Sequence, residues 1–156
     1  MRRAVRVAGA GTWPSEGAVV ATLSYHDRHR RRVRLADDRG EAFLLDLERA
    51  QLLRVGDGLA CDDGSWIRVQ AAAEAVCEAS AADGAALARL AWHLGNRHVP
   101  VQIIAGGIRF LDDPVLAAML EGLGATVARA HAPFNPEPGA YAGDAGHGHD
   151  GHGHEH

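Results

Sequence analysis

The first half of the chain, residues 19–69, is built from short alternating runs of apolar and polar residues separated by turn-forming residues. Two pairs of runs flank the turn sequences Asp-Asp-Arg-Gly and Asp-Asp-Gly: residues 30–35 with 41–47, and residues 58–61 with 65–69. Alternating runs around such a turn are typical of a β-hairpin. The pattern therefore predicts a small all-β domain over residues 1–70. We expect this domain to be of a type that binds partners or peptides.

The second half has a helical periodicity after a first apolar strand at 75–78. Apolar residues recur at the i, i+3, i+4 and i+7 spacing of one helix face: Leu87, Leu90, Ala91 and Leu94. Ser80 with Asp83 three residues later resembles a capping box, which predicts a helix that begins after Ser80. Gly95 stands where a left-handed glycine would end this helix.

A second helix is predicted after Asp113, which can cap it, with Pro114 in its first position and Gly124 at its end. Apolar runs that predict further strands lie at 101–104, 108–111 and 126–130. The resulting order β-α-β-β-α-β is the ferredoxin-like arrangement. We expect an α+β protein: a small N-terminal all-β domain, a ferredoxin-like domain over residues 71–142, and a tail at 143–156.

The tail contains Gly, Asp and His without apolar periodicity, and we expect it to be disordered. Five of the ten histidines of the chain lie here: His147, His149, His152, His154 and His156. Imidazole suits Ni, Cu, Zn and Co, and flexible glycines let several rings converge on one ion. An expression tag would be an uninterrupted histidine run, and a solubilising tail would need no histidine. With no sulfur ligand in it, the tail predicts binding of an exchangeable divalent ion rather than Cu(I).

The charge of the chain argues against a strongly cationic nucleic-acid binder, since 16 basic residues, all of them Arg, face 20 acidic ones for a net charge of −4. A basic run nevertheless occurs in the first half: Arg28, Arg30, Arg31, Arg32 and Arg34. We interpret it as a solvated strand face with Val33 and Leu35 turned inward. RNA binding through this strand stays an alternative, although no Phe or Tyr is interleaved to stack on bases.

Cys61 and Cys77 form no CxxC motif and are expected to be reduced, apolar residues, as in a cytoplasmic protein. Gly9, Gly11 and Pro14 interrupt the segment after the basic start, so no signal peptide is expected. We expect no membrane partner.

His98 lies just past the predicted end of the first helix, in the sequence Gly-Asn-Arg-His. One imidazole supplies only one of the four to six ligands that such ions require. By residue type alone, a single histidine at a helix end is more often a partner for free carbonyls than a metal ligand.

Several blocks of the chain, taken together, resemble a known family. These blocks are Trp-His-Leu-Gly-Asn-Arg-His-Val-Pro-Val-Gln-Ile at 92–103, Asp-Pro-Val-Leu-Ala-Ala-Met-Leu at 113–120, Ala-Pro-Phe-Asn-Pro-Glu at 132–137 and Gly-Ala-Tyr at 139–141. In this order they resemble the urease accessory protein UreE family, and the likeness extends over nearly the whole chain.

The resemblance implies a nickel metallochaperone without enzymatic activity, which carries Ni(II) as cargo and could take Zn(II), Cu(II) or Co(II) in vitro. It implies a homodimer formed through the C-terminal domain. It also implies delivery to the urease maturation complex, which includes a GTPase, and to apo-urease. The last histidine of the motif, His98, maps onto the metal ligand that each subunit contributes at the dimer axis. Two-fold symmetry would turn one imidazole into a pair.

Some positions depart from the family pattern. Residues 111–114 contain no histidine, which makes an accessory site there doubtful, and Trp92 stands where Tyr is commoner. We interpret His93 as structural, and we expect surface roles for His26, His29 and His131.

Two other functions stay open. A general divalent-metal storage protein would bind many ions without delivering them. A metal-dependent hydrolase would need an open coordination position beside a fixed general base, and the chain has no GxSxG, HExxH or phosphate-loop sequence.

Overall fold

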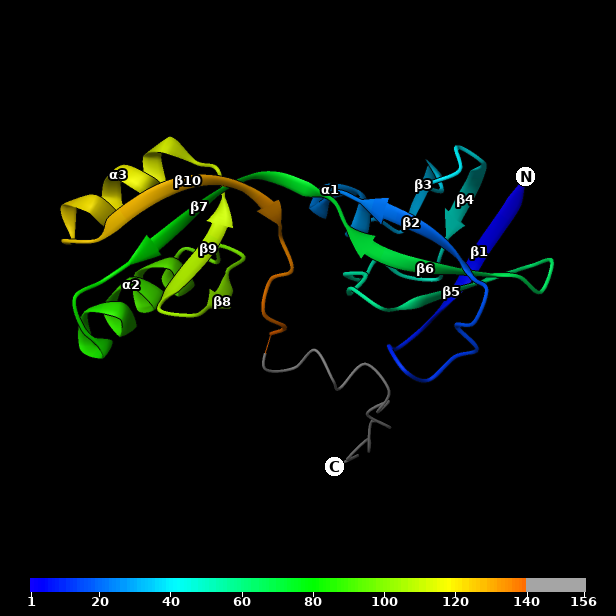
Figure 1. The fold of residues 1–156 in the computed structure, drawn as a ribbon, viewed down its shortest axis with the longest axis horizontal. Helices are drawn as coiled ribbons and strands as arrows, with labels where there is room; N and C mark the ends of the chain where they lie inside the picture. Colours follow the sequence, from blue (N-terminus) through cyan, green and yellow to red (C-terminus); the bar gives the residue numbers. More distant parts are fainter. Residues whose placement is uncertain (140–156) are drawn as a thin grey trace, which may run out of the picture.

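The computed structural model describes residues 1–139, which form two lobes, each built on its own β-sheet (Figure 1). The first lobe contains β1 (Arg2–Ala8), β2 (Val19–Leu23), α1 (Tyr25–Arg28), β3 (Arg32–Ala36), β4 (Ala42–Asp46), β5 (Gly58–Cys61) and β6 (Trp66–Ala71). The second contains β7 (Ala73–Ser80), α2 (Gly84–Asn96), β8 (Gln102–Ile104), β9 (Gly107–Leu111), α3 (Pro114–Gly122) and β10 (Thr126–Pro133). The α+β class expected from the sequence is confirmed.

Within the described residues, the sheet of the first lobe has the strand order β2-β6-β5-β1-β4-β3. Both predicted hairpins are present, β3 with β4 and β5 with β6, each antiparallel. Alternate residues of these strands point into one apolar cluster, which includes Phe43, Leu45, Leu59, Ile67 and Val69. The alternation along these strands therefore reflects one buried face, and Leu35 and Val33 turn toward it as predicted.

The pattern did not identify β1, although it lies inside the sheet between β5 and β4. Three arginines and a single fully buried residue, Ala4, obscure its alternation. The four-residue helix α1 was also not predicted. Ser24 caps it by accepting a hydrogen bond from the Asp27 amide at 3.1 Å.

The second sheet, as described, has the strand order β10-β7-β9-β8, and all neighbours are antiparallel. Both helices pack on the same face of this sheet through one apolar cluster: Cys77, Ala79, Leu90, Leu94, Ile108, Phe110, Ala117 and Leu120. The opposite face carries Arg109, which pairs with Glu78 at 2.9 Å. The lobe is thus two layers thick, helices over sheet.

Both ends of α2 differ from the prediction. Ser80 remains in β7, where it pairs with Gly107 and Thr126, and Asp83 is the cap, accepting from the Ala86 amide at 2.8 Å. The helix also continues through Gly95 to Asn96.

The second helix, α3, begins as predicted. Asp113 accepts hydrogen bonds from the amides of Val115 and Leu116, Pro114 is the first residue, and Gly124 follows with φ 89°. The helix end is also correct, since the left-handed glycine follows its C-cap residue Leu123.

Arg28 does not lie on the solvated strand face to which we assigned it. It belongs to α1, and its side chain is fully buried between the lobes, where it donates to backbone carbonyls. Arg31, Arg32 and Arg34 are exposed as expected, with Leu35 buried behind them. The basic strand is therefore shorter than the sequence indicated, which weakens the RNA-binding alternative.

The lobes lie side by side along the long axis of the molecule, and β6 and β7 join them with only Ala72 between the two strands (Figure 1). After β10, residues 134–139, which we call the stem, run back between the lobes (Figure 1). No helix in residues 1–139 is both long and apolar enough to cross a membrane.

Candidate metal centre

His98 lies in the turn that ends α2. Its amide donates to the Gly95 carbonyl at 3.0 Å, and the amide of Val99 donates to the Leu94 carbonyl at 3.2 Å. This pair of reversed hydrogen bonds is the Schellman motif, which satisfies the free carbonyls at a helix C-terminus. His98 is the residue of the motif that takes the left-handed conformation, with φ 56°.

The sequence predicted the left-handed conformation for Gly95, but the structure has it three residues later, at His98. The reason is packing. The residue after the left-handed one usually makes an apolar contact with the last turn of the helix. Val99 packs against the cluster that contains the fully buried Leu94. With Gly95 in the left-handed position, the polar Asn96 would have to fill this role.

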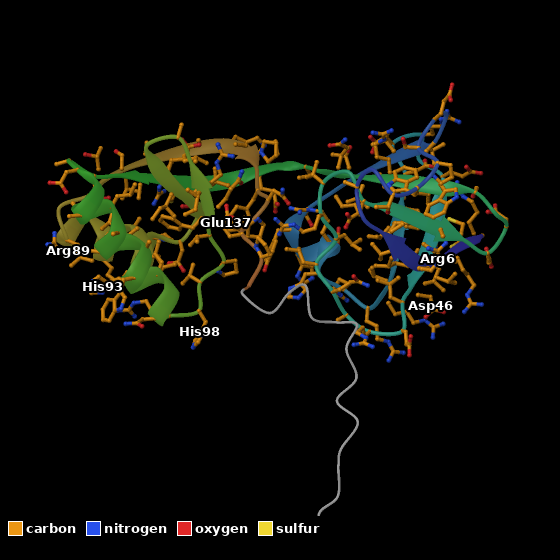
Figure 2. All side chains as sticks on the ribbon, turned by 90° about the horizontal axis from the view of Figure 1, so that it is seen from below. Arg6, Asp46, Arg89, His93, His98 and Glu137 are labelled. Carbon is orange, nitrogen blue, oxygen red and sulfur yellow. The ribbon has the colours of Figure 1, made fainter. Side chains whose placement is uncertain are left out.

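The imidazole of His98 is exposed, and Figure 2 shows it projecting from the loop away from the body of the lobe. It lines a shallow cavity of about 320 Å³ together with Arg97, Val99, Pro100, Leu111, Asp112, Asp113, Leu116 and Phe134. The cavity thus brings together the loop after α2, the junction of β9 with α3, and the start of the stem.

Two carboxylates of this cavity were not considered as site residues from the sequence. Asp113 is engaged as the cap of α3. Asp112 lies 3.7 Å from Arg129 Nε and accepts from the Cys77 thiol at 3.4 Å. Burial raises the pKa of Cys77, so this thiol stays protonated and is a poor metal ligand. The Asp-Asp-Pro sequence before α3 is the signal that could have placed both carboxylates near the cavity.

In the part of the chain that the structure describes, no group of three or more His, Cys, Asp or Glu residues is arranged to hold a metal ion. A metal ion at His98 would therefore need ligands from outside residues 1–139 of one chain. The tail histidines, His147, His149, His152, His154 and His156, lie outside the described residues.

The other described histidines have local contacts of their own. His93 is half-buried on α2, and its ring meets the indole of Trp92 edge to face with centroids 5.0 Å apart. His26 places Nε2 2.7 Å from a nitrogen of Arg30. His29 and His131 are exposed. The structure places none of these four in the His98 cavity.

Comparison with known proteins gives matches along nearly the whole chain. The family model "UreE urease accessory protein, N-terminal domain" matches residues 4–72, and "UreE urease accessory protein, C-terminal domain" matches residues 74–156. A urease accessory protein UreE of Bradyrhizobium sp. (strain ORS 278) is 52% identical over 142 residues, which cover 91% of this chain and 68% of that protein. One from Beijerinckia indica is 47% identical over 150 residues, covering 96% of this chain and 87% of the relative.

Proposed function

The chain belongs to the family of UreE urease accessory proteins, and from this premise we propose that it is a nickel metallochaperone rather than an enzyme. It binds Ni(II) as cargo and delivers it to the urease maturation complex, including its GTPase, for insertion into apo-urease. It takes Zn(II), Cu(II) or Co(II) at the same ligands in vitro, since imidazole suits all four ions.

The observation that carries the proposal is the position of His98. The imidazole is exposed at the rim of a cavity, on a backbone conformation that costs about 1 kcal/mol or more for a residue with a Cβ. Strained conformations of this kind cluster at functional sites. His98 supplies one nitrogen ligand per chain.

A second copy of the chain supplies the next ligand. We propose a homodimer whose two-fold axis passes beside His98, so that the pair of imidazoles meets there. The helical layer of the second lobe has exposed apolar side chains that a dimer would bury: Trp92 of α2 is 63% exposed and Val115 of α3 is 78% exposed. The interface therefore lies on this layer.

The tail histidines complete the coordination. The amide of Glu137 donates to the Val101 carbonyl at 2.7 Å, and Val101 follows His98 by three residues. His147 follows Glu137 by ten residues, which span at most about 35 Å when extended. His147 and the histidines after it are thus within chain length of the His98 pair.

Ligands from two chains and from the tail allow stepwise transfer. Each imidazole leaves separately while a ligand of the partner replaces it, so the ion need not be free in solution. Neutral nitrogen ligands favour this exchange, because Ni(II) bound by imidazole alone has no thiolate to hold it.

The finer architecture follows the same proposal. We assign residues 1–70 to a partner-binding β-domain, 71–142 to a ferredoxin-like domain for metal binding and dimerisation, and 143–156 to the His-rich tail. The strand order β10-β7-β9-β8 with α2 and α3 on one face supports the ferredoxin-like assignment. Two free, buried cysteines support a place in the cytoplasm.

The test is His98→Ala, with His131→Ala as the matched control at an exposed histidine of β10. Calorimetric nickel titration should lose the tightest site in His98→Ala and keep it in His131→Ala. Urease activation at limiting nickel should fall only in the first variant. Retention of both the tight site and full activation in His98→Ala would show that the tail alone is the donor.

A general nickel store is the second candidate, favoured by the five histidines of the tail. It predicts the opposite result, because His98→Ala would leave those five ligands and nearly all of the capacity in place.

A further inference from the structure

The first sheet has two outer strands, β2 and β3, and each has one side that no other strand of residues 1–139 pairs with (Figure 1). On β2 this side is occupied by Asp38, from the turn between β3 and β4. The Asp38 amide donates to the Val20 carbonyl at 2.8 Å, and its carboxylate accepts from the amide and the hydroxyl of Thr22 at 2.8 and 2.7 Å. The chain therefore covers this edge of the sheet by itself.

The free side of β3 has no such cover in the described residues. Just before β3, the Leu47 amide donates to the Arg31 carbonyl at 2.9 Å, so the backbone of Arg31 faces β4. Backbone groups alternate between the two sides of an antiparallel strand, so those of Arg32, Arg34 and Ala36 face the free side. No hydrogen bond found within residues 1–139 reaches them, and they can pair with a further strand.

Arginine side chains surround this free side. Arg31, Arg32 and Arg34 are all exposed. Arg32 lies 3.8 Å from Asp46 of β4, whereas no ion pair within residues 1–139 involves Arg31 or Arg34. Like charges opposite one another destabilise a sheet, so the same edge of a second copy is a poor partner for β3. An extended segment with acidic side chains has the complementary charge.

A cavity of about 540 Å³ lies along the same edge. It is lined by Arg34, Leu35 and Ala36 of β3 and by Thr22 and Leu23 of β2, so it lies between the two outer strands. Space for the side chains of an added segment is therefore present beside the free backbone groups.

We propose that the free edge of β3 is a docking site to which a partner protein adds an acidic extended segment as a further strand. The inference rests on the partner-binding role proposed for residues 1–70, and it gives that role a place and a chemistry. Alternate side chains of the added strand lie on the outer face beside Arg32 and Arg34, and these are the acidic ones. The intervening side chains face the cavity, which Asp27 also lines and where a second carboxylate would be repelled.

Single-stranded RNA is the other class of ligand that a basic strand can bind. The cavity has no aromatic ring among the residues of the 1–139 segment that line it, so a base has nothing to stack on. The free amides and carbonyls of β3 also match the repeat of an extended peptide. The observations therefore favour a peptide segment.

The probe is the synthetic peptide acetyl-Glu-Thr-Glu-Val-Glu-Thr-Glu-amide, which we call the Glu peptide, labelled with fluorescein. It is titrated with the full-length, metal-free protein, and fluorescence anisotropy gives the Kd. We expect a Kd below about 1 mM, and at least about tenfold weaker binding of the Lys peptide, in which every Glu is replaced by Lys. No binding of the Glu peptide at this concentration, or equal binding of the two peptides, would overturn the proposal.

Reversal of the edge charge tests the position of the site. The double variant Arg32→Glu with Arg34→Glu should bind the Glu peptide at least about tenfold more weakly and should prefer the Lys peptide. Arg49→Glu, at an exposed arginine of the first lobe outside β3, is the matched control and should keep the original preference. An unchanged preference in the double variant would place binding elsewhere and overturn the proposal.

Circular dichroism reports the fold of each variant. If the double variant fails to fold, Arg34→Glu alone is expected to reduce the preference for the Glu peptide at least about threefold, since Arg34 has no ion pair to lose within residues 1–139. An unchanged preference in this single variant would then contradict the proposal.

Hydrogen exchange followed by NMR separates strand addition from charge attraction alone. A saturating amount of the Glu peptide should slow the exchange of the amides of Arg32, Arg34 and Ala36 at least about fivefold, because these amides become hydrogen-bonded. Binding that leaves their exchange rates unchanged would show that no strand is added, and the proposal would be wrong.

Two further measurements complete the test. An oligouridine of about ten nucleotides that binds more tightly than the Glu peptide, and loses binding in the charge-reversed variant, would assign the edge to nucleic acid and overturn the proposal. His98→Ala should bind the Glu peptide as the original chain does. Because the peptide is titrated without nickel, a failure of strand addition leaves the proposed metal site standing, and nickel titration of His98→Ala decides that site separately.

Discussion

At the scale of single residues, His98 occupies a backbone position that glycine fills in most helix termini of this type. The sequence pointed to a helix end near this place and to a histidine in it, but it assigned the left-handed conformation to Gly95. His98 takes the left-handed conformation instead, because Val99 packs against the core with Leu94. This is a tertiary contact, which the local spacing of residues does not reveal. The metal role of His98 came from resemblance, because one imidazole carries no ligand spacing.

The backbone conformation of His98 makes a prediction about stability. We expect His98→Gly to be at least as stable as the original chain and about 1 kcal/mol more stable than His98→Ala, because glycine has no Cβ to strain the left-handed conformation. Thermal and urea unfolding measure this difference. Both variants should lose the tight nickel site equally, because the site depends on the imidazole and not on the stability of the turn.

A result in which His98→Gly is less stable than His98→Ala would contradict the left-handed assignment. Gly124→Ala is the positive control. Gly124 follows α3 with φ 89°, so the added Cβ should lower the stability of the protein.

A buried carboxylate in the first lobe makes the stability depend on pH. The Asp37 side chain is inaccessible to solvent and pairs with Arg2 at 2.8 Å. Burial raises its pKa, but hydrogen bonds from the Glu41 amide, the Arg2 guanidinium and the Arg39 amide together lower the pKa below the usual value. Because the folded pKa is the lower one, Asp37 contributes stability above its unfolded pKa of 3.8, and this contribution is lost as the pH falls through the folded pKa.

We therefore expect Asp37→Asn to lower the free energy of unfolding by about 1 to 2 kcal/mol at pH 7. The difference from the original chain should shrink as the pH falls below about 4. Urea unfolding at a series of pH values measures it. Glu48→Gln, at an exposed carboxylate, should show no such difference, and a constant effect of Asp37→Asn down to pH 2 would rule out this source of the pH dependence.

At the scale of elements, the sequence identified the two hairpins of the first lobe and both helices of the second. It failed where an element is defined by its neighbours. β1 is a strand because β4 and β5 pair with it on both sides, and Ser80 stays in β7 because Gly107 and Thr126 pair with it. The prediction for Arg28 failed in a similar way. Its charge indicates an exposed side chain, but the carbonyls that accept its hydrogen bonds belong to segments that are distant in the sequence.

The exposed layer of helices makes a prediction about assembly. Light scattering at micromolar concentration should give twice the 16.5 kDa of one chain, with or without nickel. Trp92→Glu should weaken the dimer at least about 30-fold, because a large apolar side chain at an interface is worth 2 kcal/mol or more and a charge would replace it.

The control for this change is Val5→Glu, which places the same charge at an exposed apolar residue of the first lobe and should leave the dimer intact. A monomer mass for the original chain would exclude the symmetric site. If Trp92→Glu associates as tightly as the original chain, the dimer interface does not include the exposed face of α2.

At the scale of the whole molecule, the tail and the lobes have separate tasks in the proposed mechanism. We expect a variant with all five tail histidines replaced by Asn, at positions 147, 149, 152, 154 and 156, to keep the fold and the dimer mass while it binds fewer nickel ions per dimer. Its changes lie outside the described lobes. In both forms, nickel binding should weaken as the pH falls, because protons compete with the metal for the imidazole nitrogens. Equilibrium dialysis followed by metal analysis gives the stoichiometry, and equal values for the two chains would contradict this division.

The junction between β6 and β7 has a consequence for how the length of this chain can vary. Side chains alternate along a strand, so one residue inserted beside Ala72 would turn Cys77 and Ala79 from the helical layer to the opposite face of their sheet. Rotation of one lobe against the other cannot absorb the extra residue, because the stem ties the two at a second point. Insertions and deletions should therefore be tolerated in the exposed loop at 48–51, between β4 and β5, whereas the spacing between the two sheets has to stay constant among homologous chains.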